Sequence, residues 1–230
     1  MFPLLHEMIQ YLTRKKVRVA FDDLDRIAPV SSLLGCDRGT PIDRYYMEQF
    51  LGKNSSLIKG TVIEVADSFY SRRFGGDRVT KFEVLHLPPG NRKSTIIGDL
   101  ADPATLPENY ADCFICTQTF QFIFDIRDAV QGAHRLLKPG GVLLATMSGI
   151  SPISRYDMDR WGDYWRFTSA SVQRLFEPLF TGGVEITCFG NVLAATAFIQ
   201  GLSVEDLPDE TLLDRNDDDY QLLITIVARK

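Results

Sequence analysis

Between residues 60 and 147, short apolar segments alternate with loops and a helical stretch, and this alternation constrains the fold more than any other feature. The helical stretch is predicted over residues 127–137, and the Lys-Pro-Gly-Gly sequence at 138–141 is expected to end it. Such alternation predicts a parallel sheet with right-handed crossovers and helices on both faces. The predicted strands are 60–65, 79–85, 94–97, 111–117 and 142–147.

Two further strands are predicted near the end of the chain, at 184–189 and 222–228. A helical segment at 191–201 and an acidic loop at 206–219 separate them, and we expect the loop to be solvated surface. The sequence therefore continues the sheet beyond the alternating region.

The first 55 residues follow a different pattern and predict a helical extension ahead of a main domain at 56–230. One helix is expected within residues 1–30, where Leu4, Leu5, Met8, Ile9 and Leu12 recur at helical spacing. A second is expected at 41–51, with Thr40 as its cap and Pro41 in its first turn.

Charge and hydropathy exclude several classes of function. The net charge is −5 and no basic stripe runs along any segment, so a nucleic-acid partner is not expected. The sequence contains neither a signal peptide nor 18 consecutive uncharged apolar residues, which predicts a cytoplasmic protein without a membrane span.

Cys113 and Cys116 have the CxxC spacing of redox and zinc motifs but lie inside an apolar segment that is predicted to be a strand. Residues three apart on a strand point to opposite faces, so the two thiols cannot bind one metal ion together. We expect both to be buried thiols and expect no metal site.

A set of short motifs in the alternating region carries a resemblance to a known family. Thr-Val-Ile-Glu-Val-Ala-Asp-Ser at 61–68 is followed by Glu83, by Gly98-Asp99-Leu100 and by Leu106-Pro107. Tyr-Ala-Asp at 110–112 and Arg-Leu-Leu-Lys-Pro-Gly-Gly at 135–141 complete the set. In this order the motifs resemble the class I S-adenosylmethionine (SAM) methyltransferases of the type 11-like group, of the kind associated with glycan biosynthesis.

The resemblance implies an α/β fold: a three-layer, Rossmann-like, seven-stranded, mostly parallel sheet with an antiparallel last strand. It implies SAM as the cofactor, bound beyond the carboxyl ends of the strands. Glu83 would bind the ribose, Asp99 and Leu100 would lie by the adenine, and Glu64 would order the loop or meet the methionyl amine. Thr117 and Gln118 would face the methyl group. The alternative for Glu83 and Asp99 is a solvated strand end.

The loop after the first strand departs from the family pattern, which has glycines where this chain has Ala66 and Ser68. Glycine there permits positive φ and close approach of the backbone to a ligand. Asp67 adds a carboxylate, which is compatible with a cationic cofactor. A nicotinamide cofactor is disfavoured further, because no G-x-G-x-x-G is present.

Residues 154–168 contain both tryptophans of the protein among aspartates and arginines, and they follow the fifth strand across the top of the sheet. The segment resembles the Trp-Arg-Phe/Tyr-Thr sequence of methyltransferases associated with glycan assembly. Aromatic faces and ionic groups suit a sugar. The alternative is that the tryptophans, four apart, only anchor a lid. The predicted acceptor-binding residues are Arg38, Tyr45, Tyr156, Arg160, Trp161, Trp165 and Arg166.

A hydroxyl acceptor needs a base, and the candidates are Asp157, Asp159 and Asp163. A second polar and aromatic cluster at 36–46 either folds over the same pocket or forms an ion-paired helix start. In the first case Asp37, Arg38, Asp43 and Arg44 would lie near the acceptor.

The sequence hypothesis is therefore methyl transfer from SAM to a sugar or glycan precursor. The alternative is a non-catalytic methyltransferase-like module that partners a glycosyltransferase or an assembly. A homodimer is compatible with both.

Overall fold

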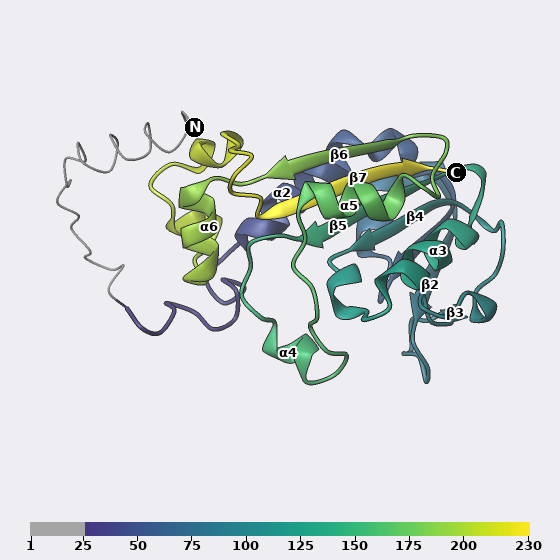
Figure 1. Ribbon diagram of the computed structural model, residues 1–230, viewed down its shortest axis with the longest axis horizontal. Helices are drawn as coiled ribbons and strands as arrows, with labels where there is room; N and C mark the ends of the chain where they lie inside the picture. Colours follow the sequence, from purple (N-terminus) through teal and green to yellow (C-terminus); the bar gives the residue numbers. More distant parts are fainter. Residues whose placement is uncertain (1–25) are drawn as a thin grey trace, which may run out of the picture.

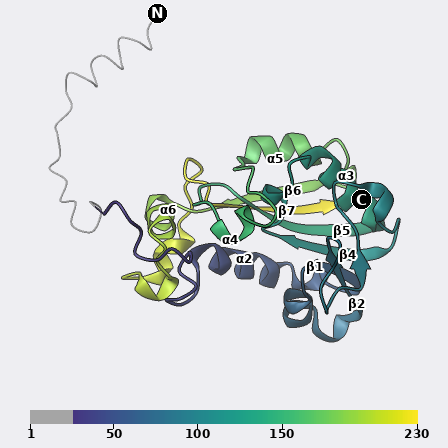
Figure 2. The ribbon, with the colours of Figure 1, turned by 90° about the horizontal axis from the view of Figure 1, so that it is seen from below.

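The computed structural model describes residues 26–230, and its core is a seven-stranded sheet with the order β3-β2-β1-β4-β5-β7-β6 (Figures 1 and 2). β7 is antiparallel to both of its neighbours, β5 and β6, whereas the other pairs are parallel. This confirms the predicted mostly parallel sheet with an antiparallel last strand. The strands are β1 Gly60–Val65, β2 Val79–His86, β3 Ile96–Ile97, β4 Ala111–Thr117, β5 Leu137–Ser148, β6 Val184–Phe189 and β7 Leu223–Arg229.

Helices cover both faces of this sheet, which gives the three layers seen in Figure 2. α3 and α5 pack on one face in a core that includes Phe114, Phe120 and Phe176. α2 and α6 pack on the other face, around Tyr46 and Phe198. The α-helices are α2 Ile42–Lys53, α3 Ile126–Leu136, α4 Arg155–Met158, α5 Ser169–Phe176 and α6 Val192–Ile199.

The crossovers in the β1–β4 half of the sheet are abbreviated. The chain between β1 and β2 forms only a π-helix at Ser71–Gly75 and a 3-10 turn at Gly76–Arg78, and a 3-10 turn at Pro103–Thr105 precedes β4.

α2 confirms the helix that was expected at 41–51, but its predicted cap is wrong. The helix begins at Ile42, and Pro41 is its N-cap without any side-chain hydrogen bond. Thr40 instead donates from its hydroxyl and its backbone N–H to the carboxylate of Glu205. The helix expected within residues 1–30 lies mostly outside the described residues, and no helix is present at 26–30. The division at residue 55 remains a prediction.

β5 begins earlier than its sequence indicated. α3 ends at Leu136, and the Lys-Pro-Gly-Gly sequence belongs to the strand rather than to a loop. Leu137 pairs with Ala111, and the register then shifts before Val142 pairs with Cys113. Gly140 has a φ of +78° there, so glycine accommodates the irregularity.

Cys113 and Cys116 are both buried and belong to the cores on opposite faces of the sheet, as the strand periodicity predicted. Burial raises the pKa of both thiols. Neither thiol is therefore placed or ionised for metal binding.

The acidic loop at 206–219 is more than solvated surface. Asp206 forms a bidentate ion pair with Arg38, and the hydroxyl of Tyr46 donates to the backbone oxygen of Leu213, which is fully buried. The loop therefore packs against α2 and against the segment that precedes it.

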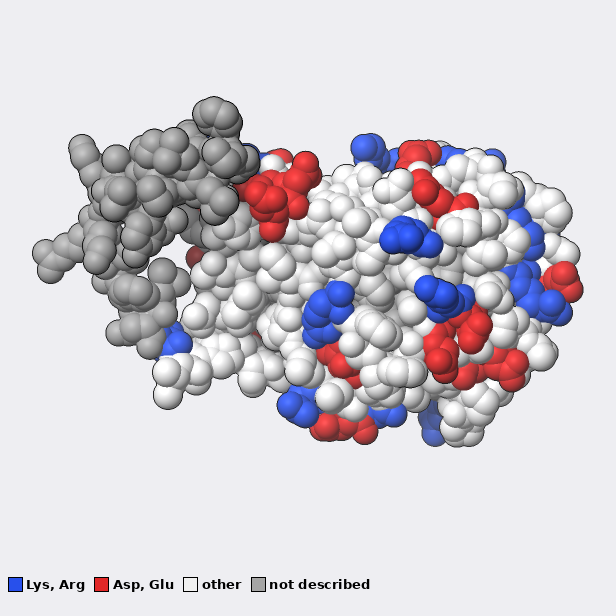
Figure 3. Space-filling model, viewed as in Figure 1, with Lys and Arg blue, Asp and Glu red and all other residues white. Residues whose placement is uncertain are grey.

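On the face drawn in Figure 3, Lys and Arg are interspersed with Asp and Glu rather than gathered in a stripe. Within residues 26–230, no helix is long and apolar enough to cross a membrane.

Candidate functional site

A cavity of about 360 Å³ lies at the carboxyl ends of β1, β2 and β4, and we call it the main cavity. This volume is within the range of small-molecule sites. Parallel sheets bind ligands at this edge, where the strand order reverses between β1 and β4. Its lining comes from residues 64–67, Tyr70, residues 85–87, residues 98–100, residues 117–119, Phe122, Ile123, Asp157 and Trp161.

The turn after β1 keeps a glycine-like backbone without glycine. Ala66 has a φ of +70°, in the left-handed region that disfavours side chains. Its N–H donates to the oxygen of Leu85, and its oxygen accepts from the Asn91 side chain at 3.1 Å. The turn therefore has the backbone conformation for which a glycine was expected, at the cost of strain at one alanine.

Glu64 lies beneath this turn and holds it in place. Its carboxylate accepts hydrogen bonds from the backbone N–H groups of Tyr70 at 3.0 Å and Ser71 at 2.8 Å. The residue is only 3% exposed, and burial raises the pKa of the carboxyl. Of the two roles expected for Glu64, the contacts show the ordering of the loop.

Asp67 also lines the main cavity, and its charge is partly compensated. One carboxylate oxygen accepts from the backbone N–H of Phe69, and the other lies 3.7 Å from Nζ of Lys93. Phe69 is exposed and does not line the cavity, and Ser68 lies on a neighbouring groove with it. The bulkier residues of this loop leave the cavity open.

Glu83, which was expected to bind the ribose, lies within β2, three residues before the end of that strand at His86, and it pairs with Ile63 of β1. Its carboxylate contacts Tyr110 and Lys81, both at 2.7 Å or less, and it does not line the main cavity. His86 occupies the end of β2 instead, with its ring edge-on to Trp161 at 5.9 Å.

The other residues expected to bind the cofactor lie at the main cavity, namely Asp99, Leu100, Thr117 and Gln118. Asp99 accepts from the backbone N–H of Ala101, which fixes its carboxylate at the turn after β3. Gln118 has a φ of +46°, so a strained residue ends β4 as well.

A second cavity of about 240 Å³ adjoins the main one, and we call it the side cavity. Gln118, Phe122 and Asp157 line both. The remaining lining of the side cavity comes from Leu34, Asp43, Gln121, Ser148, Ser151, Pro152, Ser154, Asp163, Arg166 and Phe198.

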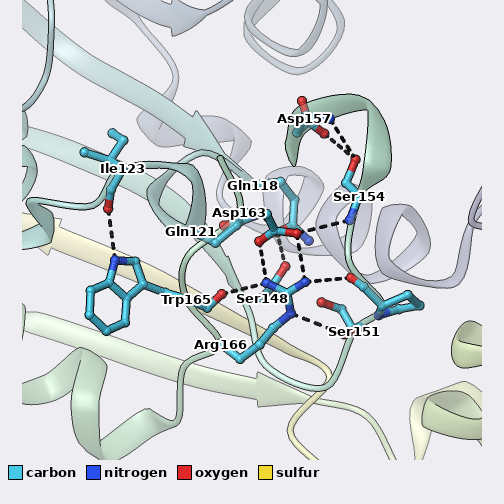
Figure 4. A network of polar contacts seen from close by, with 11 residues as sticks. Gln118, Gln121, Ile123, Ser148, Ser151, Ser154, Asp157, Asp163, Trp165 and Arg166 are labelled. Atoms are coloured by element: carbon cyan, nitrogen blue, oxygen red, sulfur yellow. Dashed lines mark hydrogen bonds and ion pairs between the residues drawn. The ribbon is translucent and has the colours of Figure 1, made fainter. Parts of the chain in front are cut away.

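The three aspartates expected to act as a base have different surroundings, and Figure 4 shows two of them, Asp157 and Asp163. Asp157 borders both cavities and accepts from the hydroxyl of Ser154 at 2.6 Å. The Asp163 side chain is fully buried and forms a bidentate pair with Arg166. Asp159 is exposed beside Arg155 and lines neither cavity. Only Asp157 is shared by the two cavities.

The two tryptophans also have different surroundings. Trp161 lines the main cavity, whereas Trp165 donates from Nε1 to the oxygen of Ile123 at 3.1 Å and stacks on Phe124. Both follow α4, which ends at Met158, so they do not share a helix. Trp165 is therefore packed as the anchoring alternative describes, whereas Trp161 lies on the cavity wall, and its contact with a ligand remains a prediction.

Of the other residues expected to bind the acceptor, Arg166 lines the side cavity and the rest lie away from both cavities. Arg38 pairs with Asp206, and Tyr45 donates its hydroxyl to Asp214 at 3.1 Å. Tyr156 and Arg160 stack on each other at 3.5 Å on the exposed side of the segment. None of these four side chains reaches either cavity, and their role in binding an acceptor remains a prediction.

Asp43 reaches the side cavity from α2, where its carboxylate accepts from the Gln118 side chain at 3.3 Å. Burial raises the pKa of this carboxyl. Gln121 and Ser148, which also line the side cavity, were missed. The only sequence signal for them was their position just after β4 and at the end of β5.

Comparisons with known proteins agree with this geometry. Residues 63–145 match the family model described as a methyltransferase domain. No curated protein sequence matches the chain significantly.

Several solved structures share the fold at low sequence identity. A SAM-dependent methyltransferase from Archaeoglobus fulgidus has a TM-score of 0.52 at 10% identity, covering 81% of this chain and 94% of its own. One from Thermotoga maritima has a TM-score of 0.52 at 13% identity, with coverages of 82% and 91%. A chain in the complex between the Haloferax volcanii Trm112 methyltransferase activator and a methyltransferase has a TM-score of 0.51 at 15% identity, with coverages of 90% and 95%.

The fit of a SAM-sized cation can be judged from the cavity itself. Carboxylates at Glu64, Asp67 and Asp99 line it, and apolar side chains such as Leu85 and Leu100 provide a surface for a base. The lining therefore suits a ligand with a cationic end and an aromatic end. Residues 63–145 match a methyltransferase domain set in a Rossmann-like sheet, and the cofactor that such a domain implies is S-adenosylmethionine.

Proposed function

We propose that this protein transfers a methyl group from SAM to a hydroxyl of a sugar or glycan precursor. The observation that carries the proposal is the pair of adjoining cavities, because Gln118, Phe122 and Asp157 connect a cofactor-sized space to a polar space beside it. A transferase needs two such spaces in contact, so that donor and acceptor meet.

The main cavity would hold the cofactor, with Asp99 and Leu100 near the adenine and the Ala66 turn against the methionyl part. Glu64 orders that turn from below. His86 stands at the end of β2, where it can offer a hydrogen bond to a ribose hydroxyl. When bound, SAM supplies an electrophilic methyl group on a positively charged sulfur.

The acceptor would bind in the side cavity and extend to Trp161 on the wall of the main cavity, whose indole suits the CH face of a pyranose. Asp157 is the residue we propose to take the hydroxyl proton, because it is the one candidate aspartate that borders both cavities. Asp163 positions Arg166 instead of reacting, since its carboxylate is fully engaged with that guanidinium. Asp43, from α2, faces the same cavity.

The test is to incubate the full chain with SAM and a panel of free sugars, methyl glycosides and short oligosaccharides, and to measure S-adenosylhomocysteine and methylated product by mass spectrometry. We expect product with a subset of the panel and its loss in Asp157→Asn, with Asp159→Asn as the matched control. Equal turnover in both variants would contradict the role of Asp157. If no sugar in the panel leads to turnover of SAM, the proposal of a sugar acceptor is contradicted.

The second candidate is a non-catalytic module that partners a glycosyltransferase or another assembly. The observations that favour it are the strained Ala66 turn and the histidine at the end of β2, where an acidic residue was expected to bind the ribose. A double variant, Ala66→Gly with Ser68→Gly, that gains cofactor binding absent from the wild type would support this candidate. Under either candidate, we propose that the protein is soluble and acts in the cytoplasm, alone or as a homodimer.

A further inference from the structure

The side cavity contains a buried hydrogen-bond acceptor without a partner. Gln121 is 3% exposed, and its side-chain oxygen Oε1 makes no hydrogen bond with any residue that the structure describes. A buried polar atom left unpaired destabilises the protein. Because Gln121 lines the side cavity, a ligand in that cavity could complete the hydrogen bonding.

The orientation of the Gln121 amide is fixed by its neighbours. Its Nε2 donates to Oε1 of Gln118 at 2.8 Å, and the hydroxyl of Ser148 donates to the same oxygen at 2.8 Å (Figure 4). The opposite end of Gln118 donates from Nε2 to the Asp43 carboxylate at 3.3 Å.

Both oxygens of the Asp43 carboxylate act as acceptors, one from the backbone N–H of Arg44 at 2.8 Å and the other from Gln118, so Asp43 determines the direction of this chain of amides. Reversing the Gln118 amide would bring its oxygen against the carboxylate. Reversing the Gln121 amide would bring its oxygen against that of Gln118. The relay from Asp43 through Gln118 therefore leaves Gln121 with its oxygen, and not its amino group, unpaired.

The charges around the cavity restrict the ligand further. Among the described lining residues, the ionisable ones are Asp43, Asp157, Asp163 and Arg166. Arg166 is engaged by Asp163 and by the backbone oxygens of Ser151 and Pro152. No lining cation is left to compensate an anionic ligand, which Asp43 and Asp157 would repel.

From these contacts we infer that the side cavity binds a neutral or cationic group that donates a hydrogen bond to Gln121 Oε1, a hydroxyl or a protonated amine, and rejects carboxylates. This inference rests on the proposed function and specifies its acceptor: an uncharged or amino sugar rather than a uronic acid. Gln121 is then a specificity-determining residue, separate from the cofactor cavity, which it does not line.

The test uses three probes that share a pyranose ring: glucose, glucosamine and glucuronate. Binding of each to the full chain, saturated with S-adenosylhomocysteine, is measured by calorimetry or ligand-observed NMR. We expect glucose and glucosamine to bind and glucuronate not to bind. Gln121→Leu removes the acceptor atom and should weaken the bound probes about five- to tenfold. Gln173→Leu, on the exposed face of α5, is the matched control and should leave them unchanged.

Asp43→Asn tests the relay itself, because an asparagine no longer forces the direction of the amides and removes one negative charge. We expect this variant to bind glucosamine more weakly and to discriminate less against glucuronate. The inference is overturned if glucuronate binds as well as glucosamine, if no probe binds while S-adenosylhomocysteine does, or if Gln121→Leu binds like the wild type. Failure of S-adenosylhomocysteine to bind at all would instead overturn the proposed function.

Discussion

The strained turn after β1 gives a prediction of unusual sign: replacing Ala66 by glycine should stabilise the protein. The left-handed conformation costs an L-residue about 1–2 kcal/mol, and a glycine at the φ of +70° avoids this cost. The glycine also gives the unfolded chain more freedom, which takes back about 0.4–1 kcal/mol. The net expectation is a gain of about 1 kcal/mol in the free energy of unfolding, or about 2–4 °C in Tm for a chain of this size.

Ala104→Gly is the matched control, because Ala104 is an exposed alanine in a 3-10 turn at ordinary negative φ. The same chemical change there should destabilise the protein by about 0.5–1 kcal/mol. Both variants are compared with the wild type by urea unfolding followed by circular dichroism. A destabilisation by Ala66→Gly equal to that of Ala104→Gly would refute the inference that the turn stores strain.

Three further predictions concern the cofactor, the pH dependence and the core. His86→Glu places a carboxylate at the end of β2 and should tighten S-adenosylhomocysteine binding about tenfold by calorimetry. Glu83→Gln, outside the main cavity, should leave this binding unchanged. Weaker binding by Glu83→Gln and no gain with His86→Glu would support Glu83 as the ribose ligand. The hydrogen bonds from Arg38 lower the pKa of Asp206, so this carboxylate stabilises the fold above about pH 4 and the contribution is lost as pH falls. The loss of unfolding free energy in Asp206→Asn, measured by urea unfolding, should therefore be smaller at pH 3 than at pH 7. An equal loss at both pH values would exclude the ionic cause. Phe176→Ala, in a fully buried position against Phe120, should cost about 3–5 kcal/mol, and a loss below 1 kcal/mol would contradict the packing.

Strand periodicity and loop signals predicted the sheet well, because apolar segments of strand length can be buried only inside a covered sheet. The opposite faces of Cys113 and Cys116 followed from the same two-residue period. β2 extends one residue beyond the predicted strand, to His86, because a polar residue normally suggests that a strand has ended. The Lys-Pro-Gly-Gly sequence was expected only to end the helix, and its place in β5 was missed because its pairing with β4 depends on a register shift that local sequence does not reveal.

The site was predictable only where it lies at strand ends. Asp99 and Gln118 could be located because the carboxyl ends of parallel strands share one edge. Arg38 and Tyr45 lie away from both cavities, and the sequence could not indicate this because their partners, Asp206 and Asp214, lie more than 160 residues away in the chain. Long-range ion pairs and hydrogen bonds of this kind form only in the tertiary structure, so local sequence does not reveal them.

The same limit explains why the sequence did not single out Gln121. Its significance lies in an oxygen that no neighbour satisfies, and that property exists only once Gln118, Ser148 and Asp43 have been brought together from three separate elements.

The central claim is that the main cavity binds the adenosyl cofactor, and calorimetric titration of the full chain with SAM tests it most directly. We expect one site per chain with a dissociation constant in the micromolar range, about −8 kcal/mol. Thr117→Trp fills the cavity from the end of β4 and should abolish binding while the circular dichroism spectrum is unchanged. An absence of heat with the wild type, or equal binding by Thr117→Trp, would contradict the assignment of this cavity.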